Sequence, residues 1–339
     1  MNPAGAASRV RYVTVVGLVA AAVVGVLAGV ALSATGPVAG VSDVGGAVSV
    51  GIPLARAVFH LAAVGAIGLA LLPVLIGHEK PRRGDAVLAR ARLAAVAAAL
   101  VWAAAAFVLL VLQTAEFRPT ATIGLGDVRG YVAAVDAGKA LLIVLALAVA
   151  FAGLGLLRVR LGERVPAEVL VGLGLFGLLP LPVTGHASDW ELGELAMVSI
   201  ELHVLSAAAW VGGLGAMTVL LIGNRTLLAR ALPRFSVLAT VCLLLSAATG
   251  LFNGLGEVGL NPSTDFWTGL FGTAYGRLVL LKLLCLVLIA AIGGYTRWRL
   301  LPRIARHEHT ALAGWATLEL AVMGLAFGFA AVLSRAPVS

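Results

Sequence analysis

Three histidines lie in or beside strongly apolar segments of this sequence. His60 occurs in FHLAAVGAIGLALL, His203 in LHVLSAAAWVGGLGAM, and His186 in LLPLPVTGHAS. An ionisable side chain inside a lipid bilayer costs about 2.5–3.5 kcal/mol on insertion scales, so such residues are usually paired or functional. Neutral imidazole binds copper, zinc and iron. The three residues therefore predict a metal site or haem ligands, and a hydrogen-bonded packing role is the alternative for each.

The residues around His203 indicate which side chains could assist it. On a regular helix, Ser199, Ser206 and Trp210 share the face of His203, whereas Glu201 points about the opposite way. Glu201 is therefore not expected to be a co-ligand. The small residues of 209–216 are typical of a close helix–helix contact, so their glycines are expected to be packing residues.

The other reactive side chains are not expected to form a metal site. Cys242 and Cys285 fall inside apolar runs without forming a C-x-x-C pair and are expected to be packing residues. Lys282, also within an apolar run, is expected to need a carboxylate partner. His78 and the segment RHEHT at 306–310 lie among charged residues and are expected to be solvated.

These side chains must be positioned by helices that cross a membrane. The chain has 339 residues, of which 61% are hydrophobic and 12% charged, whereas a soluble domain is about half apolar and a quarter charged. Apolar runs of 18 or more residues recur, and they are too long for barrel strands. The sequence therefore predicts an all-α, polytopic membrane helix bundle. In that setting the net charge of +8 reflects topology, and no nucleic-acid partner is expected.

Nine membrane-spanning helices are predicted. They cover residues 12–34, 53–77, 93–115, 138–157, 168–186, 197–221, 235–255, 275–297 and 313–334. With the N-terminus inside, the inner segments hold 17 of the 24 Lys and Arg residues. The positive-inside rule then places the N-terminus in the cytoplasm and the C-terminus outside. His60 and His203 fall at similar depths in the outer half of the membrane.

The last eight predicted helices resemble a duplication. FHLAAVGAIGLALL matches LHVLSAAAWVGGLGAM with His60 opposite His203, and DAGKALLIVLAL matches AYGRLVLLKLLC with Gly138 opposite Gly276. Four helices per unit give both units the same orientation, which is a parallel repeat. We therefore expect an N-terminal anchor helix in 1–36, a first repeat in 37–190 and a second repeat in 191–339. A cleaved signal peptide is the alternative for the first helix.

The predicted outer loops are acidic. Residues 187–196 contain three carboxylates and 256–274 contain two, and neither loop has a Lys or Arg: Asp189, Glu191, Glu194, Glu257 and Asp265. An acidic outer mouth next to His186 would concentrate cations. The alternative is that these loops are acidic only because the positive-inside bias removes basic residues.

Four segments together carry a family resemblance. LHVLSAAAWVGGLGAM, RFSVLATVCLLLSAATGLFNGL, AYGRLVLLKLLCLVLIAAIGGYTRWRLLPRI and LELAVMGLAFGFAAVLSRAPVS, in this order, resemble the copper resistance protein D (CopD) family over residues 197–339. RAVFHLAAVGAIGLALL and LLPLPVTGHAS resemble the N-terminal part of longer members. Some such units are fused to CtaG-like cytochrome oxidase assembly domains, and no CtaG-like part is expected here.

The resemblance implies a multi-pass protein of the bacterial inner or plasma membrane that handles copper. It implies copper import or delivery and copper tolerance, with His60, His186 and His203 as metal positions. Copper ions, the lipid bilayer and a periplasmic or extracellular copper-binding protein are the expected partners, and no enzymatic activity is expected. One alternative is a single-haem redox protein with haem b between His60 and His203. Another is a non-catalytic membrane assembly partner.

Overall fold

The computed structural model describes residues 3–33, 46–77, 84–118, 122–180, 193–261, 263–300 and 312–336. This part of the chain is helical and contains no strand, which confirms the predicted all-α fold. Eight of its helices are long and apolar enough to cross a membrane. They are α1 (Pro3–Ser33), α2 (Gly46–Ile76), α3 (Asp85–Phe117), α5 (Asp136–Leu161), α7 (Gly193–Leu221), α8 (Arg225–Gly259), α10 (Ala274–Tyr295) and α12 (Leu312–Leu333).

The fifth predicted span, at 168–186, needs correction. The structure has there a helix of ten residues, α6 (Ala167–Phe176), followed by turns as far as Pro180. A helix of this length rises about 15 Å, which is half the hydrocarbon thickness of a bilayer. Pro180 disfavours helical backbone at the residue before it, and the helix has already ended at Gly177. The remainder of the predicted span lies outside the described residues.

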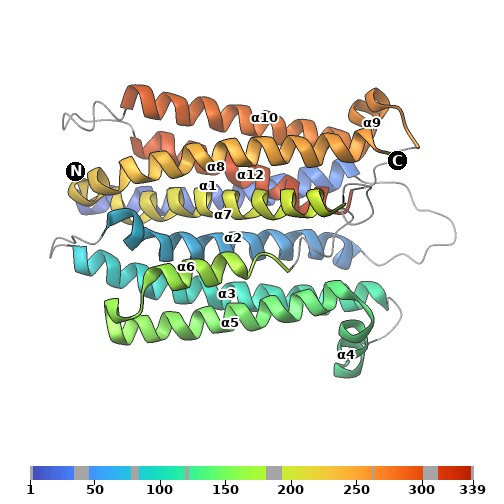
Figure 1. The fold of residues 1–339 in the computed structure, drawn as a ribbon, viewed down its shortest axis with the longest axis horizontal. Helices are drawn as coiled ribbons and strands as arrows, with labels where there is room; N and C mark the ends of the chain where they lie inside the picture. Colours follow the sequence, from blue (N-terminus) through green and yellow to red (C-terminus); the bar gives the residue numbers. More distant parts are fainter. Residues whose placement is uncertain are drawn as a thin grey trace.

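The long helices run along one common direction (Figure 1). In this view α1 begins at the left end of the bundle and α12 finishes at the right end. Two short helices, α4 (Leu125–Ala134) and α9 (Phe266–Gly272), lie at the right end. The short 3-10 helix η2 (Gly162–Arg164) and the π-helical segment η5 (Thr296–Leu300) lie at the left end. We call the end with α4 and α9 the outer end, as the positive-inside rule predicts.

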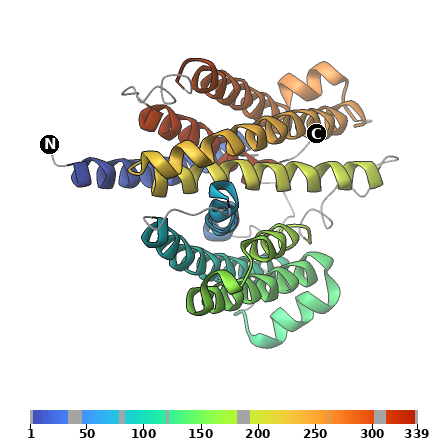
Figure 2. The same ribbon diagram turned by 60° about the vertical axis from the view of Figure 1, so that its left-hand side comes forward.

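Helix α2 lies between two groups of helices (Figure 2). Helices α3 to α6 gather on one side of it, and α7, α8, α10 and α12 gather on the other. Helix α1 belongs to the second group, because it packs along α12 and the hydroxyl groups of Thr14 and Thr317 are 2.7 Å apart. The largest buried apolar cluster joins α2, α3, α7 and α8 and includes Phe59 and Trp102.

Two stretches of the chain repeat one order of elements. In α2 to α5 and again in α7 to α10, two long helices are followed by a short helix at the outer end and a third long helix. A Cβ atom at Gly138 would lie 2.9 Å from the Tyr131 ring of α4, and one at Gly276 would lie 2.2 Å from the Gly269 carbonyl oxygen of α9. Both glycines thus let a long helix approach the short helix before it. The duplication, in which Gly138 is matched with Gly276, stays a prediction.

Helices α2 and α7 cross with their backbones in contact. A Cβ atom at Gly68 would lie 2.0 Å from the carbonyl oxygen of Gly212, and one at Gly212 would lie 2.4 Å from that of Val64. Only glycine fits at either position, because no side-chain carbon can approach backbone that closely. The glycines of 209–216 are therefore packing residues, as predicted.

The inner end of α2 is fastened to the second group by Arg234 of α8. Its Nη1 atom donates hydrogen bonds to the carbonyl oxygens of Leu75 and Ile76, at 3.1 and 2.8 Å. A cationic side chain satisfies the carbonyl groups that a helix leaves unpaired at its C-terminus. The chain leaves α2 through Gly77, which has a φ of +89° and packs directly against the guanidinium group.

Candidate metal site around His60 and His203

His203 lies in a cluster of polar side chains between α7 and α8. We call this the α7–α8 polar cluster, and it consists of Ser199, His203, Ser206, Ser246, Thr249 and Asn253. Ser206 and Ser246 approach each other within 2.8 Å through their hydroxyl groups. Asn253 donates to the Ser199 hydroxyl at 3.1 Å, and Ser199 donates to the Thr249 carbonyl at 3.4 Å. Ser199 and Ser206 share the His203 face, as predicted.

The hydrogen bonds of His203 define its tautomer. Its Nδ1 atom lies 3.2 Å from the carbonyl oxygen of Ser246 and 3.2 Å from the Thr249 hydroxyl oxygen. A carbonyl oxygen only accepts, and the Thr249 hydroxyl already donates its proton to the Leu245 carbonyl at 2.5 Å. Nδ1 must therefore carry the hydrogen in the neutral ring. The lone pair is then on Nε2, which is the nitrogen free to bind a metal.

Glu201 is not among the partners of His203. In the described part of the chain its carboxylate forms no hydrogen bond or ion pair, and it lies partly buried on another face of α7. The prediction that Glu201 faces away from His203 agrees with this arrangement.

His60 lies in a different environment on α2. Its ring is 5.3 Å from the Phe59 ring in an edge-on arrangement and 6.4 Å from the Phe327 ring of α12, measured between centroids. The Nδ1 atom of His60 is buried and has no hydrogen-bond partner among the described residues. A buried polar atom without a partner costs about 1–3 kcal/mol. A bound ligand would remove this cost.

The two histidines occupy matched positions on helices that touch. His60 is eight residues from Gly68, and His203 is nine residues from Gly212, both toward the outer end. At 1.5 Å per residue, these positions lie about 12 and 14 Å from the helix crossing. The structure thus places both predicted ligands at nearly the same depth, on the outer side of the contact between α2 and α7.

One lysine acts electrostatically on both histidines. The ammonium group of Lys282 on α10 interacts with His60 and with His203, and Arg56, one turn above His60, also acts on His60. The carboxylate partner predicted for Lys282 is not found, because Lys282 has no ion pair or hydrogen bond in the described ranges. Lys282 is thus a cation close enough to both histidines to influence each of them electrostatically.

The third predicted ligand, His186, lies outside the described residues. The parts of the chain that the structure describes contain no group of three His, Cys, Asp or Glu side chains that could hold a metal ion. The cysteines Cys242 and Cys285 are buried in separate apolar clusters, as expected for packing residues. The three-histidine site therefore stays a prediction, and the structure describes the surroundings of two of its three residues.

The acidic outer residues are only partly described, since Asp189 and Glu191 lie outside the described ranges. Glu194 is exposed at the start of α7. Asp265 is also exposed, but it caps α9 by accepting hydrogen bonds from the backbone of Trp267 and Thr268, each at 3.1 Å. The hydroxyl and backbone of Thr268 lower the pKa of Asp265, which keeps its carboxylate charged.

Charged contacts join the two groups of helices at the outer end. Arg56 of α2 donates to the Ser334 hydroxyl just beyond α12, and Arg335 pairs with Glu116 of α3. Nearby, the Tyr131 hydroxyl donates to Gln113 at 3.0 Å, and burial raises the pKa of Tyr131, so that it stays protonated. These contacts lie one turn or more above His60.

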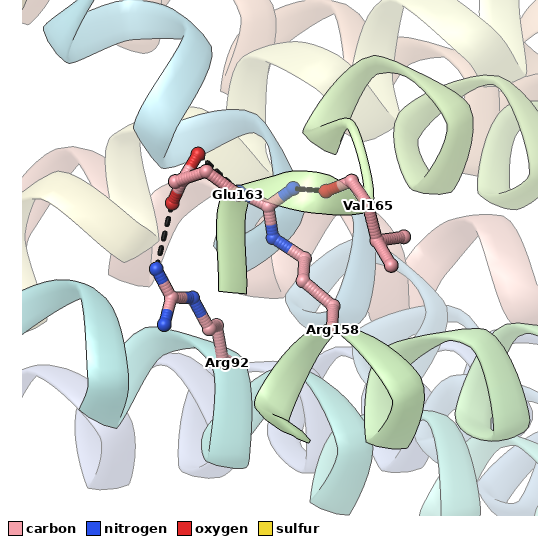
Figure 3. Close-up of polar contacts among 4 residues, drawn as sticks. All are labelled: Arg92, Arg158, Glu163 and Val165. Atoms are coloured by element: carbon pink, nitrogen blue, oxygen red, sulfur yellow. Dashed lines mark hydrogen bonds and ion pairs between the residues drawn. The ribbon is translucent and has the colours of Figure 1, made fainter. Parts of the chain in front are cut away.

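A second charged cluster lies at the inner end of the first group (Figure 3). Glu163 in η2 pairs with Arg92 of α3 at 2.6 Å and with the buried Arg158 of α5 at 3.1 Å. Arg158 also donates to the carbonyl oxygen of Val165 and so fixes the turn before α6. Because every group in Figure 3 has a partner, this cluster is structural.

Sequence reasoning missed the α8 half of the α7–α8 polar cluster. Ser246, Thr249 and Asn253 recur at intervals of three and four residues in LLSAATGLFNGL, a spacing that places them on one helix face. A polar stripe in an otherwise apolar helix was the available signal. The residue that it faces, however, depends on how α8 is rotated against α7.

The geometry defines an α-helical membrane protein with two intramembrane histidines at one depth. Two family models match the sequence of this chain. One is copper resistance protein D, over residues 229–333, and the other is the N-terminal domain of copper resistance protein D-like proteins, over residues 47–193. The chain belongs to the copper resistance protein D family.

A curated relative is the copper transport protein CutJ of Bacillus subtilis (strain 168). It is 34% identical over 124 residues, which are 35% of this chain and 22% of that protein. The matched region therefore spans about a fifth of the length of this relative. No solved structure matches the chain.

Proposed function

We propose that this membrane protein binds copper between His60 and His203 and moves it inward across the membrane. The observation that carries this proposal is the pair of acceptors at Nδ1 of His203, which leaves the Nε2 lone pair available to a metal, on a helix that packs directly against the helix of His60. A pair of neutral imidazole nitrogens is a suitable ligand set for copper. The membership in the copper resistance protein D family supports copper as the cargo.

The proposed direction rests on the outer end of the bundle. Glu194 and Asp265 are exposed there and would attract cations, or a copper-binding protein that delivers them. His186 would receive the ion, and His60 with His203 would hold it inside the membrane. The curated relative is named a copper transport protein, which agrees with a transport function for this chain.

The test is copper accumulation and tolerance in cells that express the full chain. We expect His203→Ala and His60→Ala to reduce accumulation to the level of cells without the protein. His309→Ala, in a predicted inner loop, is the matched control and should accumulate copper normally. Unchanged accumulation and tolerance in His203→Ala would overturn the proposal and support an assembly role.

The purified protein gives a second, independent test. Bound copper without a Soret band in the visible spectrum would support the copper site. A Soret band that disappears in His60→Ala and His203→Ala would overturn it and support haem b as the cofactor.

A further inference from the structure

The Nδ1 atom of His203 meets a surface of α8 that offers only hydrogen-bond acceptors. The Ser246 carbonyl and the Thr249 hydroxyl oxygen are both 3.2 Å away. The Thr249 hydroxyl is oriented by its own donation to Leu245, so its lone pairs are turned toward the ring. This arrangement stabilises the tautomer with hydrogen on Nδ1. The other tautomer would set the Nδ1 lone pair against the lone pairs of the Ser246 carbonyl and the Thr249 hydroxyl.

A glycine makes this contact possible. A Cβ atom at Gly250 would lie 3.1 Å from Cε1 of His203 and 3.4 Å from Nδ1. The first distance is tighter than an ordinary contact, so any larger residue at 250 would push the ring away from α8 by a few tenths of an ångström. The acceptors and the glycine occupy consecutive turns of α8 and contact one side of the imidazole ring.

We propose that Thr249, the Ser246 carbonyl and Gly250 form a cradle on α8 that positions His203 for copper. The cradle holds the neutral ring with hydrogen on Nδ1 and leaves Nε2 available as the ligand. Thr249 and Gly250 are thus positioning residues, since they act on the ion only through His203. The proposal rests on the proposed function, in which His203 binds copper.

General metal-site chemistry supports this role. A histidine that binds a metal through one nitrogen usually donates its other N–H to a carbonyl or another acceptor, which fixes the ring and raises its basicity. Loss of such an outer partner typically costs about 10- to 100-fold in metal affinity. The bond between Thr249 and His203 has this form.

The experiment uses the full chain, purified in lipid nanodiscs, with ¹⁵N-labelled histidine. The nitrogen shifts report the tautomer of His203, which is assigned by the signal that is lost in His203→Ala. Copper(I) affinity is measured in parallel by competition with a chromogenic chelator. We expect the wild-type protein to show a protonated Nδ1 and an unprotonated Nε2.

Four variants separate positioning from folding. Thr249→Val keeps the shape of the side chain but removes the acceptor, and should give mixed tautomers and about tenfold weaker copper binding. Thr249→Ser should restore both properties. Gly250→Ala should fold at least as well, since alanine favours helix, yet also weaken copper binding. Thr114→Val is the control, because Thr114 on α3 makes the same bond to a carbonyl one turn back, that of Leu110.

An unchanged tautomer and affinity in Thr249→Val would overturn the cradle, even if His203→Ala abolishes copper binding. Equal losses in Thr249→Val and Thr114→Val would also overturn it, because the effect would then be structural. If His203→Ala binds copper normally, the proposed function fails, whereas the tautomer measurement still decides whether the cradle exists.

Discussion

His60 on α2 and His203 on α7 lie at similar positions along their helices, but their surroundings differ. His203 has two acceptors at Nδ1, from Ser246 and Thr249, whereas Nδ1 of His60 has no partner in the described part of the chain. The matches between the two halves are offset by 138 to 143 residues. Over that range Thr249 corresponds to residues 106–111, AFVLLV, all of which are apolar. The first half therefore lacks the acceptor that orients the ring in the second.

This difference shows how one helix position can serve in two ways. The ring of His203 is oriented before a ligand arrives, and a buried hydrogen-bond network of this kind rigidifies its members. His60 lies among aromatic rings and lacks such a network, so a ligand would supply the missing partner of its ring. In the proposed copper site, His203 would be the fixed ligand and His60 the adaptable one.

The largest effect is expected from removing both ligands. If His60 and His203 hold one ion, His203→Ala, His60→Ala and the double variant should each lower copper accumulation by at least about tenfold, with no further loss in the double variant. Copper content per cell measures this. Losses that multiply in the double variant would contradict a shared site and separate the two histidines.

The next effect concerns the glycine contact between α2 and α7, the helices that carry the two histidines. Gly68→Ala would place a Cβ atom against the Gly212 carbonyl, so α2 and α7 must separate. Overpacking of this kind costs about 1–3 kcal/mol, and the apparent midpoint of thermal denaturation should fall with copper affinity. Gly65→Ala is the control in the same helix, because its nearest neighbour would be 3.9 Å away. Equal behaviour of the two variants would contradict the crossing.

Lys282 should influence both histidines alike. Its ammonium group influences both rings electrostatically, so it would repel a copper ion in the proposed site. Lys282→Leu removes this repulsion and should raise copper(I) affinity by about tenfold, as expected for a nearby charge in a partly buried site. Chelator competition measures it. A decrease in affinity would show that Lys282 supports binding.

The smallest effect is expected at the edge of the α7–α8 polar cluster. Ser199→Ala removes the hydrogen bonds to Asn253 and to the Thr249 carbonyl but leaves both partners of the His203 Nδ1 atom. Such bonds between membrane helices average about 0.6 kcal/mol, so stability should fall slightly while the tautomer stays unchanged. Ser49→Ala, whose exposed hydroxyl bonds only within α2, is the control. A changed tautomer in Ser199→Ala would extend the cradle to this residue.

Helix periodicity made much of this fold and site predictable. Residues three, four and seven positions from His203 must share its face, which correctly gave Ser199 and Ser206 and excluded Glu201. The apolar runs predicted the eight long helices of the described residues, because length and hydrophobicity decide whether a segment can span a bilayer.

The remaining features depend on contacts between helices that a linear pattern does not contain. The partners of His203 on α8 depend on the rotation of that helix, and the position of Lys282 near both rings depends on the packing of α10. Residues 168–186 were predicted to be one span from their hydrophobicity, although α6 ends at Phe176. Gly177, which follows the last residue of α6, packs closely against Trp102 of α3, a residue far away in the sequence.

The glycine contact between α2 and α7 also has a mechanical meaning. Two rods that touch at one point can tilt about it as about a fulcrum, with little displacement at the point of contact. A relative tilt of about 10° would move groups 12 Å away by about 2 Å, given the rise of 1.5 Å per residue that separates His60 from Gly68. His60 and His203 lie on the longer, outer parts of α2 and α7, whereas Arg234 holds the shorter, inner part of α2 in place. The separation of His60 and His203 is thus more sensitive to the angle between the two helices than the separation at the glycine contact.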